Sequence, residues 1–283
     1  MYSVVIILVL IELCSGGLEK RASKDQTMIA VLDLTTPTTW TEMSEYFLAV
    51  QKHWKICVNC GIPGLGTSMH LDNFGSAGGG TYPAVIPPEY LLTRLKIIDV
   101  SKQAKRNPDF VLSLSIAMQW PAIKRDSQEP TLLLFKFGWV EPPNIKRGCV
   151  CNMPGISFEL AKWIAGNLSH VVGVATDTPT VESHETREFT TRTNANVLGR
   201  AGVYMIENVR VHKKVPEQGC MALALPLKML QSVHVPTRLV AFCPTRQTDQ
   251  KVVMGLRKTD MTEMISRDHE VKLDDLMAVN SKA

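Results

Sequence analysis

A histidine and an aspartate two residues apart, His70 and Asp72, lie in a glycine-rich stretch that runs from Gly64 to Pro88. On an extended segment, side chains two residues apart point to the same side, so both groups can reach one metal ion or one substrate group. The alternative is a solvated polar pair in a loop, because a His-x-Asp pair by itself is common. This stretch is therefore the first candidate for chemistry in the chain.

Further motifs lie on both sides of this pair. In chain order, the set is Asp33-Leu34-Thr35, His70-Leu71-Asp72, Gly78-Gly79-Gly80-Thr81-Tyr82, Ile86-Pro87-Pro88-Glu89-Tyr90, Phe137-Gly138-Trp139, Pro154-Gly155-Ile156-Ser157, Asp177-Thr178-Pro179-Thr180, Gly202-Val203-Tyr204-Met205-Ile206-Glu207-Asn208 and Leu223-Ala224-Leu225-Pro226. With these motifs, residues 27–245 resemble the cyclase family, a superfamily that includes kynurenine formamidases and isatin hydrolases. A set of matches in the same order is much more specific than any one of them.

This resemblance implies an α/β protein with the family's β/β/α swivelling-domain fold in a single domain. It also implies a metal-dependent hydrolase that acts on a small aromatic amide. The reaction would be that of kynurenine formamidase, an arylformamidase of tryptophan catabolism, which converts N-formylkynurenine to kynurenine and formate. The metal would be zinc or manganese.

Half of the metal ligands that the resemblance implies are missing. When the family signature His-x-x-x-His-x-Asp-x-x-x-His is aligned on the His-x-Asp pair, Gly66 and Ser76 occupy the positions of the outer histidines. Further on, Glu207 matches a family glutamate, but Ala195 stands where a histidine precedes it by twelve residues.

The remaining ligands would be His70, Asp72 and Glu207. Three ligands cannot hold a pair of ions, and they would hold one ion weakly. The sequence therefore predicts weakened or lost catalysis.

Other polar groups could complete or replace this site. His184 and Glu185 are expected on a loop, where either could replace a lost ligand or lie on the surface. Asp177 ends an expected parallel strand. There it could take part in the functional site, or it could make a structural hydrogen bond in a turn. An inward-facing Glu207 needs a partner if it is ionised, and His70 and Asn208 are the candidates.

The hydrophobic pattern predicts strands separated by helices, which is typical of an α/β domain. A helix is expected over residues 157–166 with Ser157 as its N-cap, and a second helix over residues 112–120. Short runs rich in Val, Ile and Leu predict buried strands at residues 28–34, 95–100, 132–139, 171–176, 203–206, 221–225 and 239–242.

The ends of the chain indicate an exported protein. Residues 1–17 resemble a signal peptide, with a buried N-terminal strand as the alternative, and they are too short to span a membrane. Asn167 begins an N-glycosylation sequon. Residues 246–283 are rich in charges of both signs, which predicts either a solvated tail with one short docked helix or a partner-binding element.

The cysteine count agrees with export. Beyond Cys14, in the expected signal peptide, six cysteines remain: Cys57, Cys60, Cys149, Cys151, Cys220 and Cys243. Such an even number permits several disulfide connectivities. Zinc binding or redox chemistry at Cys57 and Cys60 is the alternative, although no second pair has the matching spacing.

The chain has 283 residues, of which 45% are hydrophobic, and a net charge of +4. It is long enough to bury a core, and it lacks the clustered basic residues of a nucleic-acid-binding protein. Three functions stay open: a formamidase-like hydrolase, a secreted relative that binds a small aromatic or acidic molecule without catalysis, and an interaction protein. Assembly into a homo-oligomer is compatible with each of them.

Overall fold

The structure is a computed structural model that describes residues 29–38, 66–72, 82–123, 128–140, 153–186, 193–211, 215–230 and 232–244. Residues 31–243 form a compact unit, and the other unit, residues 1–30 and 244–283, lies almost entirely outside the described residues. The expected signal peptide, the charged tail, Ser76 and four further cysteines (Cys57, Cys60, Cys149 and Cys151) also lie outside the described residues.

A mixed eight-stranded sheet forms the centre of the described structure. Its strands are β1 (Ile29–Asp33), β2 (Ser68–His70), β3 (Leu92–Asp99), β5 (Thr131–Lys136), β7 (Val171–Thr176), β8 (Tyr204–Glu207), β9 (Cys220–Pro226) and β10 (His234–Pro244). Strands β3, β5, β7 and β8 run parallel to one another, and β2, β9 and β10 pair antiparallel with their neighbours. A separate two-stranded sheet joins β4 (Val111–Leu112) to β6 (Gly155–Ile156).

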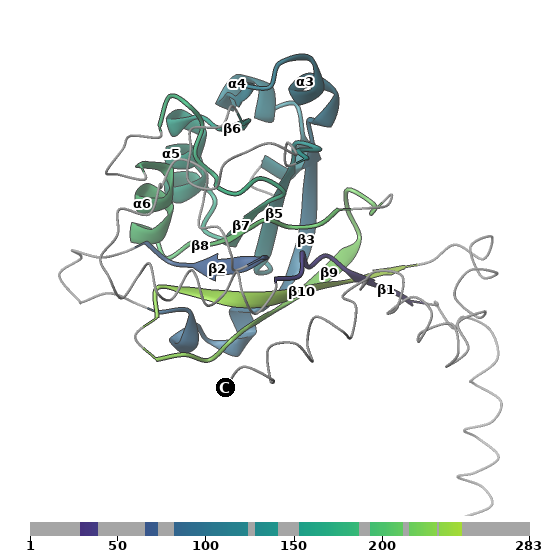
Figure 1. Cartoon of the computed structure of the whole chain (residues 1–283), viewed down its shortest axis with the longest axis vertical. Helices are drawn as coiled ribbons and strands as arrows, with labels where there is room; N and C mark the ends of the chain where they lie inside the picture. Colours follow the sequence, from purple (N-terminus) through teal and green to yellow (C-terminus); the bar gives the residue numbers. More distant parts are fainter. Residues whose placement is uncertain are drawn as a thin grey trace, which may run out of the picture. The chain divides into compact units, whose positions relative to one another are not determined.

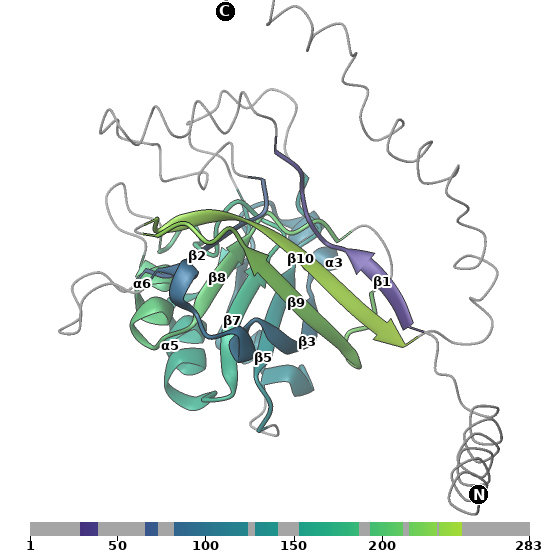
Figure 2. The same ribbon diagram turned by 90° about the horizontal axis from the view of Figure 1, so that it is seen from below.

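The large sheet curls back on itself, because β10 pairs with β2 at one side and with β9 at the other. Strand β9 also pairs with β3, so the order β2-β8-β7-β5-β3-β9-β10 closes into a ring of strands. Figure 2 shows β9 and β10 running side by side in front of β3, β5 and β7, with β1 next to β10. The expected α/β fold of the family is confirmed, with a barrel-like sheet at its centre.

The sheet has a hydrophobic core on each face, because side chains alternate along each strand. Leu132 and Leu134 of β5 belong to a core that is built almost entirely from strand residues and lies inside the ring. Leu133 and Phe135 belong to the other core, together with residues of the helices. All four of these side chains are completely buried.

Helices cover the outer face of the parallel strands. They are α3 (Ser101–Arg106), α4 (Leu114–Ala117), α5 (Phe158–Asn167) and α6 (Thr193–Arg200), and short 3₁₀ helices lie at Pro83–Val85, Pro88–Tyr90 and Pro121–Ile123. Figure 1 shows α5 and α6 beside the parallel strands, and α3 near the end of β3. No helix among the described residues combines the length and hydrophobicity needed to cross a membrane.

Helix α5 begins where the sequence predicts it. The Ser157 hydroxyl accepts a hydrogen bond from the Leu160 N–H over 3.2 Å, which satisfies one of the unpaired donors of the first turn. Leu160, Ala161 and Ile164 are buried, whereas Phe158 is 40% exposed. The phenyl ring instead lies beneath the ammonium group of Lys162, 5.6 Å from it.

Two expectations about the strands need correction. Strand β1 is not a buried strand: Ile29 and Val31 are 57% and 62% exposed. The reason is that β1 is an edge strand. It pairs with β10 on one side, so fewer neighbouring residues cover its side chains. The expected run at residues 239–242 is the later part of a much longer strand, β10, which begins at His234.

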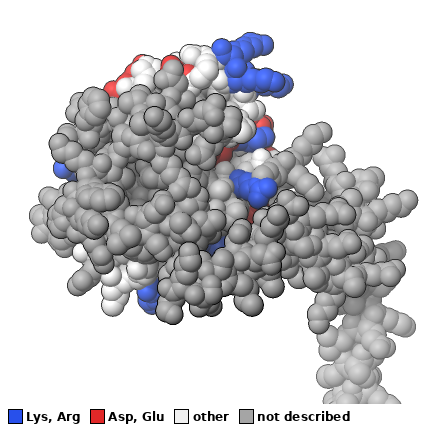
Figure 3. All heavy atoms as spheres, viewed as in Figure 1, with Lys and Arg blue, Asp and Glu red and all other residues white. Residues whose placement is uncertain are grey.

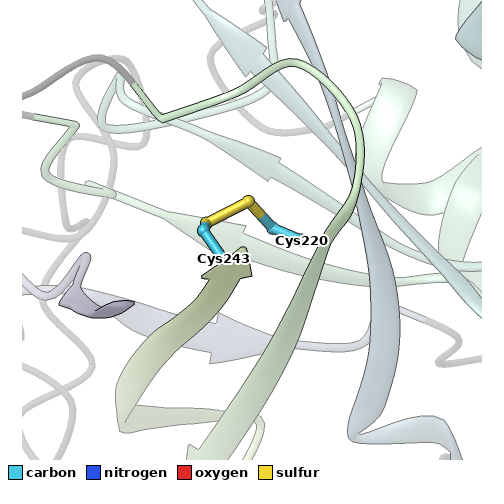
Figure 4. The surroundings of a disulfide bond; sticks show 2 residues. All are labelled: Cys220 and Cys243. Atoms are coloured by element: carbon cyan, nitrogen blue, oxygen red, sulfur yellow. A yellow bond between two sulfur atoms is a disulfide. The ribbon is translucent and has the colours of Figure 1, made fainter. Parts of the chain in front are cut away.

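A disulfide joins Cys220 at the start of β9 to Cys243 at the end of β10 (Figure 4). The two strands are antiparallel, and the preceding pair in their register is Phe242 with Met221. The two cysteines are therefore directly opposite each other, and both are buried. The bond fixes the pair of strands that closes the ring.

Candidate functional site

The candidate site lies on the outer face of the sheet, where β2, β8 and β10 are neighbours. Register pairs His70 with Met205 and with His234, and it pairs Ser68 with Glu207. The residues next to these polar groups along the strands point into the ring: Met69, Leu71, Tyr204, Ile206 and Val235. Because alternate side chains point to opposite faces, His70, His234 and Glu207 share the face that the helices cover.

Both ring nitrogens of His70 lie next to a carboxylate. Nδ1 is 2.8 Å from Oδ1 of Asp72, and Nε2 is 3.2 Å from Oε1 of Glu207. His70 is completely buried and Glu207 is 1% exposed, whereas the Asp72 side chain is 21% exposed. An imidazole between two carboxylates is well placed to carry a proton on each nitrogen, and the resulting cation offsets the buried negative charge of Glu207.

Glu207 has a second partner besides His70. Its Oε1 accepts a hydrogen bond from the N–H of Val181 over 3.2 Å. Val181 belongs to the segment after β7, and this segment is also tied to β8 by the bond from the Asn208 N–H to the Thr178 carbonyl oxygen. The Asn208 amide group donates to the Gly66 carbonyl oxygen, so Asn208 holds the backbone near the site.

His234 is the member of the site that the sequence did not predict. Its ring stacks on that of His70, with centroids 4.3 Å apart and an interplanar angle of 18°. No spacing rule connects these two histidines, because β2 and β10 are far apart in the chain and meet only through the register of the sheet. The strand expected at residues 239–242 does not reach His234, and a strand pattern does not reveal the partner strand.

The donor atoms fit one divalent ion and do not fit two. Ligand atoms of His70, Asp72 and His234 lie within 4.8 Å of one another. Ligands of a tetrahedral zinc lie about 3.3 Å apart, given metal–ligand bonds of about 2.0–2.1 Å, so small movements would gather them around one ion. One ring must also turn, since nearly parallel stacked rings cannot direct their lone pairs at the same ion.

The predicted set of His70, Asp72 and Glu207 does come together, but not around a common point. Asp72 and Glu207 lie at opposite nitrogens of the same imidazole ring. One nitrogen of His70 can therefore join an ion with only one of these carboxylates. With Glu207 on the far side of the ring, His234 is the more suitable third ligand.

Two of the three positions of the missing family histidines, Gly66 and Ala195, are closely packed. Gly66 has a φ of +59°, and a Cβ atom there would overlap the carbonyl oxygen of Thr36. Ala195 is completely buried near the start of α6, and its N–H donates to Oε1 of Glu182 over 2.9 Å. The other oxygen of Glu182 accepts the N–H of Asn194 over 3.1 Å, so this buried carboxylate holds the first turn of α6.

Helix α6 fixes Asp72 as well as covering the site. A Cβ atom at Gly199 would overlap the backbone of Asp72, so only glycine lets the helix approach this closely. The Glu182 cap and the Gly199 contact together determine where α6 lies over the site. The sequence did not single out Glu182, because a glutamate on a loop is normally solvated.

The other predicted residues lie elsewhere. His184 and Glu185 are exposed. Asn167 is exposed at the end of α5, where its Nδ2 donates to the Trp163 carbonyl oxygen over 3.2 Å. Asp177 follows β7, and its two oxygens accept the N–H groups of Phe137 and Gly138 over 2.8 and 2.7 Å.

The fold is shared with solved hydrolase structures. Isatin hydrolase A from Ralstonia solanacearum is 17% identical with a TM-score of 0.57, covering 83% of this chain and 97% of that one. Isatin hydrolase A from Labrenzia aggregata, bound to benzyl benzoate, is 21% identical with a TM-score of 0.55 over 64% and 73%. A structure described as a potential metal-dependent hydrolase with cyclase activity is 20% identical with a TM-score of 0.51 over 77% and 100%.

At these identities the similarity establishes the fold alone. A comparison with functionally curated proteins returned no match. The sequence profile of the Cyclase family matches residues 32–183, which is more than half of the 283-residue chain. The matched range contains His70 and Asp72, while Glu207 and His234 lie beyond it. The sequence match, together with the shared fold, shows that this protein belongs to the cyclase family.

Proposed function

We propose that this protein is a cyclase-family member whose hydrolytic site has been reduced, so that catalysis of the kynurenine formamidase type is weak or lost. The observation that carries this proposal is the buried Asp72–His70–Glu207 arrangement. With a proton on each nitrogen, His70 would supply the positive charge that offsets the carboxylates. The polar groups therefore balance one another through protein contacts.

A second argument is access. His70 and Glu207 are 0% and 1% exposed, so a substrate amide cannot reach either group without a change of conformation. The Asp72 side chain is the one member of the trio with a substantial solvent-exposed surface. A catalytic base needs to lie within hydrogen-bond reach of the group whose proton it takes. The buried histidine does not meet that condition in this conformation.

If an ion binds, His70, Asp72 and His234 are the residues that would hold it. Two nitrogens and one carboxylate oxygen form a ligand set that zinc or manganese accepts. Such an ion would supply an activated water and polarise a carbonyl group. In that state Glu207 would keep its contact with the other nitrogen of His70 and hold the ring in orientation, as carboxylates commonly do for metal-binding histidines.

The substrate of any residual activity would be a small N-formyl aromatic amine. The alternative is a protein that binds a small aromatic or acidic molecule without turning it over. We also propose secretion, because a disulfide between Cys220 and Cys243 suits an oxidising compartment. The expected signal peptide and the Asn167 sequon agree with this proposal.

The test combines metal content with turnover. We would purify the full chain from a secreting host, measure bound zinc and manganese by mass spectrometry, and assay formate release from N-formylkynurenine with and without added metal. We expect less than one ion per chain and little turnover. Stoichiometric metal together with formate release that disappears in His70→Ala and His234→Ala would contradict the proposal.

A further inference from the structure

A cavity of about 550 Å³ lies outside the candidate site, at the carboxyl ends of the parallel strands β3 and β5. The α3 helix, which follows β3, forms one wall through Ser101, Lys102 and Lys105. The segment after β5 forms the opposite wall through Phe137, Trp139 and Val140. The volume is in the range of small-molecule sites and is far larger than an inorganic anion needs.

The first wall is positively charged. Lys102 and Lys105 are exposed and lie three residues apart, which places them on the same side of α3. Among the described residues, the lining contains no Asp or Glu. Figure 3 shows basic side chains gathered at the end of the molecule where α3 lies in Figure 1.

The acidic groups nearby have other partners. Asp99 pairs with the ammonium group of Lys136 over 2.7 Å and also accepts the Ser101 hydroxyl. Asp177 accepts the N–H groups of Phe137 and Gly138. In the part of the chain that the structure describes, the charge presented to the cavity therefore comes from the two α3 lysines, and it favours an anion.

The second wall is apolar and aromatic. Phe137 is 2% exposed, so its ring is held by the core. Trp139 is half-buried. Because Asp177 holds the N–H groups of residues 137 and 138, this wall is ordered before any ligand arrives, and preorganisation favours binding. Aromatic rings in such a wall favour an aromatic ligand.

The cavity is separate from the histidine cluster. The cluster lies on β2, β8 and β10, whereas the cavity lies at β3 and β5, and β7 stands between β5 and β8. With neighbouring strands about 4.8 Å apart, β5 and β8 are about 10 Å apart. A ligand in this cavity therefore needs no metal and no contact with His70.

We propose that the cavity between α3 and the segment 137–140 binds a small aromatic carboxylate. The carboxylate lies between Lys102 and Lys105, and the ring packs against Trp139. This proposal is independent of catalysis at the histidine cluster, because the two sites share no residues.

The test measures binding of 1-naphthoate to the full chain by isothermal titration calorimetry. We expect saturable binding that weakens with added salt. In the double variant Lys102→Gln/Lys105→Gln, the affinity for 1-naphthoate should fall on the order of tenfold. Trp139→Ala should weaken binding by a similar factor, and Trp139→Phe should retain most of it. The neutral analogue 1-naphthalenemethanol should bind at least severalfold more weakly.

The controls separate this site from others. Lys162→Gln removes a lysine of α5 and should leave the affinity unchanged. A chelator should also have no effect. The proposal is overturned if the folded wild type does not bind naphthoate, if the double lysine variant binds it as tightly, if the alcohol binds equally well, or if the chelator abolishes binding.

Discussion

His70 is the residue on which the buried charges of the candidate site depend. It lies between Asp72 and Glu207, at 2.8 and 3.2 Å, and is itself completely buried. A buried carboxylate that loses its partner is strongly destabilising, whereas removing both members of a pair is tolerated better. The histidine therefore stabilises the fold whether or not it takes part in chemistry.

The first prediction concerns this pair. We expect His70→Gln to lower the free energy of unfolding by about 3 kcal/mol, because Glu207 is left buried beside a neutral group. In a Glu207→Gln background the same change should cost about 1 kcal/mol or less. Urea denaturation of the two single variants and the double variant measures the coupling. Additive effects of the two substitutions would show that the two side chains do not interact electrostatically.

The second prediction concerns pH. Burial raises the pKa of Asp177 from 3.8 to about 6, against the opposing hydrogen bonds from Phe137 and Gly138. The native protein therefore takes up this proton at a higher pH than the unfolded chain does. The stabilisation from this protonation is complete below pH 3.8 and is lost as the pH rises through about 6.

We accordingly expect Asp177 to make the unfolding free energy about 1 kcal/mol larger at pH 5 than at pH 7. Asp177→Asn cannot titrate, so it should remove this part of the pH dependence. Urea denaturation of both proteins at the two pH values measures the difference. An identical change between pH 5 and pH 7 in both proteins would contradict the prediction.

The third prediction concerns the position of a lost family histidine. Gly66 has a positive φ, and a side chain there meets the Thr36 carbonyl oxygen. Gly66→Ala should therefore destabilise the protein by about 2 kcal/mol or more. Gly66→His should do the same without increasing zinc affinity. Thermal unfolding with and without zinc checks this, with Gly166→Ala as control, since a Cβ atom at Gly166 meets no neighbour within 4 Å.

At the scale of elements, the sequence predicted those that carry a strong local pattern. Strand β7 coincides with the expected range of residues 171–176, and α5 begins after the expected N-cap Ser157. Strand β2 and helix α6 were not expected. Strand β2 has only three residues, and α6 has a hydroxyl and two asparagines in its sequence TNANVLGR, so neither has a long hydrophobic repeat.

The fourth prediction concerns the start of α5. Ser157→Ala removes the hydroxyl that accepts the Leu160 N–H and should lower stability by about 1 kcal/mol. Ser157→Thr keeps a hydroxyl and should retain most of that stability. Denaturant midpoints of the two variants provide the comparison. Equal losses in both variants would mean that packing, and not the cap, determines the effect.

The candidate site was predictable only in part, for a reason that lies at the scale of elements. His70, Asp72 and Glu207 could be proposed because motifs near them in the sequence identify them. His234 became visible only through the register of β10 with β2. Glu182 became visible only through the bonds that it accepts from the start of α6. Both depend on contacts between distant segments, which local patterns do not contain.

At the scale of the whole molecule, the closed ring of strands depends on the pairing of β9 with β10. The disulfide between Cys220 and Cys243 joins the two strands across a separation of 23 residues. The cysteine count indicated disulfides but left their connectivity open. The pairing could not be derived from the sequence, because it follows from the register that places the two cysteines opposite each other.

The fifth prediction concerns this crosslink. Cys220→Ala/Cys243→Ala should lower the free energy of unfolding by about 3 kcal/mol, since the crosslink restricts the unfolded chain. Urea denaturation under oxidising conditions measures this loss. The wild type can also be unfolded and refolded under reducing conditions, with its thiols free. The difference in unfolding free energy between the wild type and the double variant should then become much smaller. Equal midpoints under oxidising conditions would contradict the prediction.

Strand β10 carries His234 at its first residue and Cys243 next to its last. Side chains of a strand alternate, so a shift of one position exchanges the two faces along its whole length. An insertion or deletion of one residue between these two positions changes their relative facing, so a register that keeps the thiol opposite Cys220 turns the imidazole toward the interior of the ring. Such a length change would remove either the covalent bond or the second histidine, so we expect natural variants to exchange residues in this strand without altering its length.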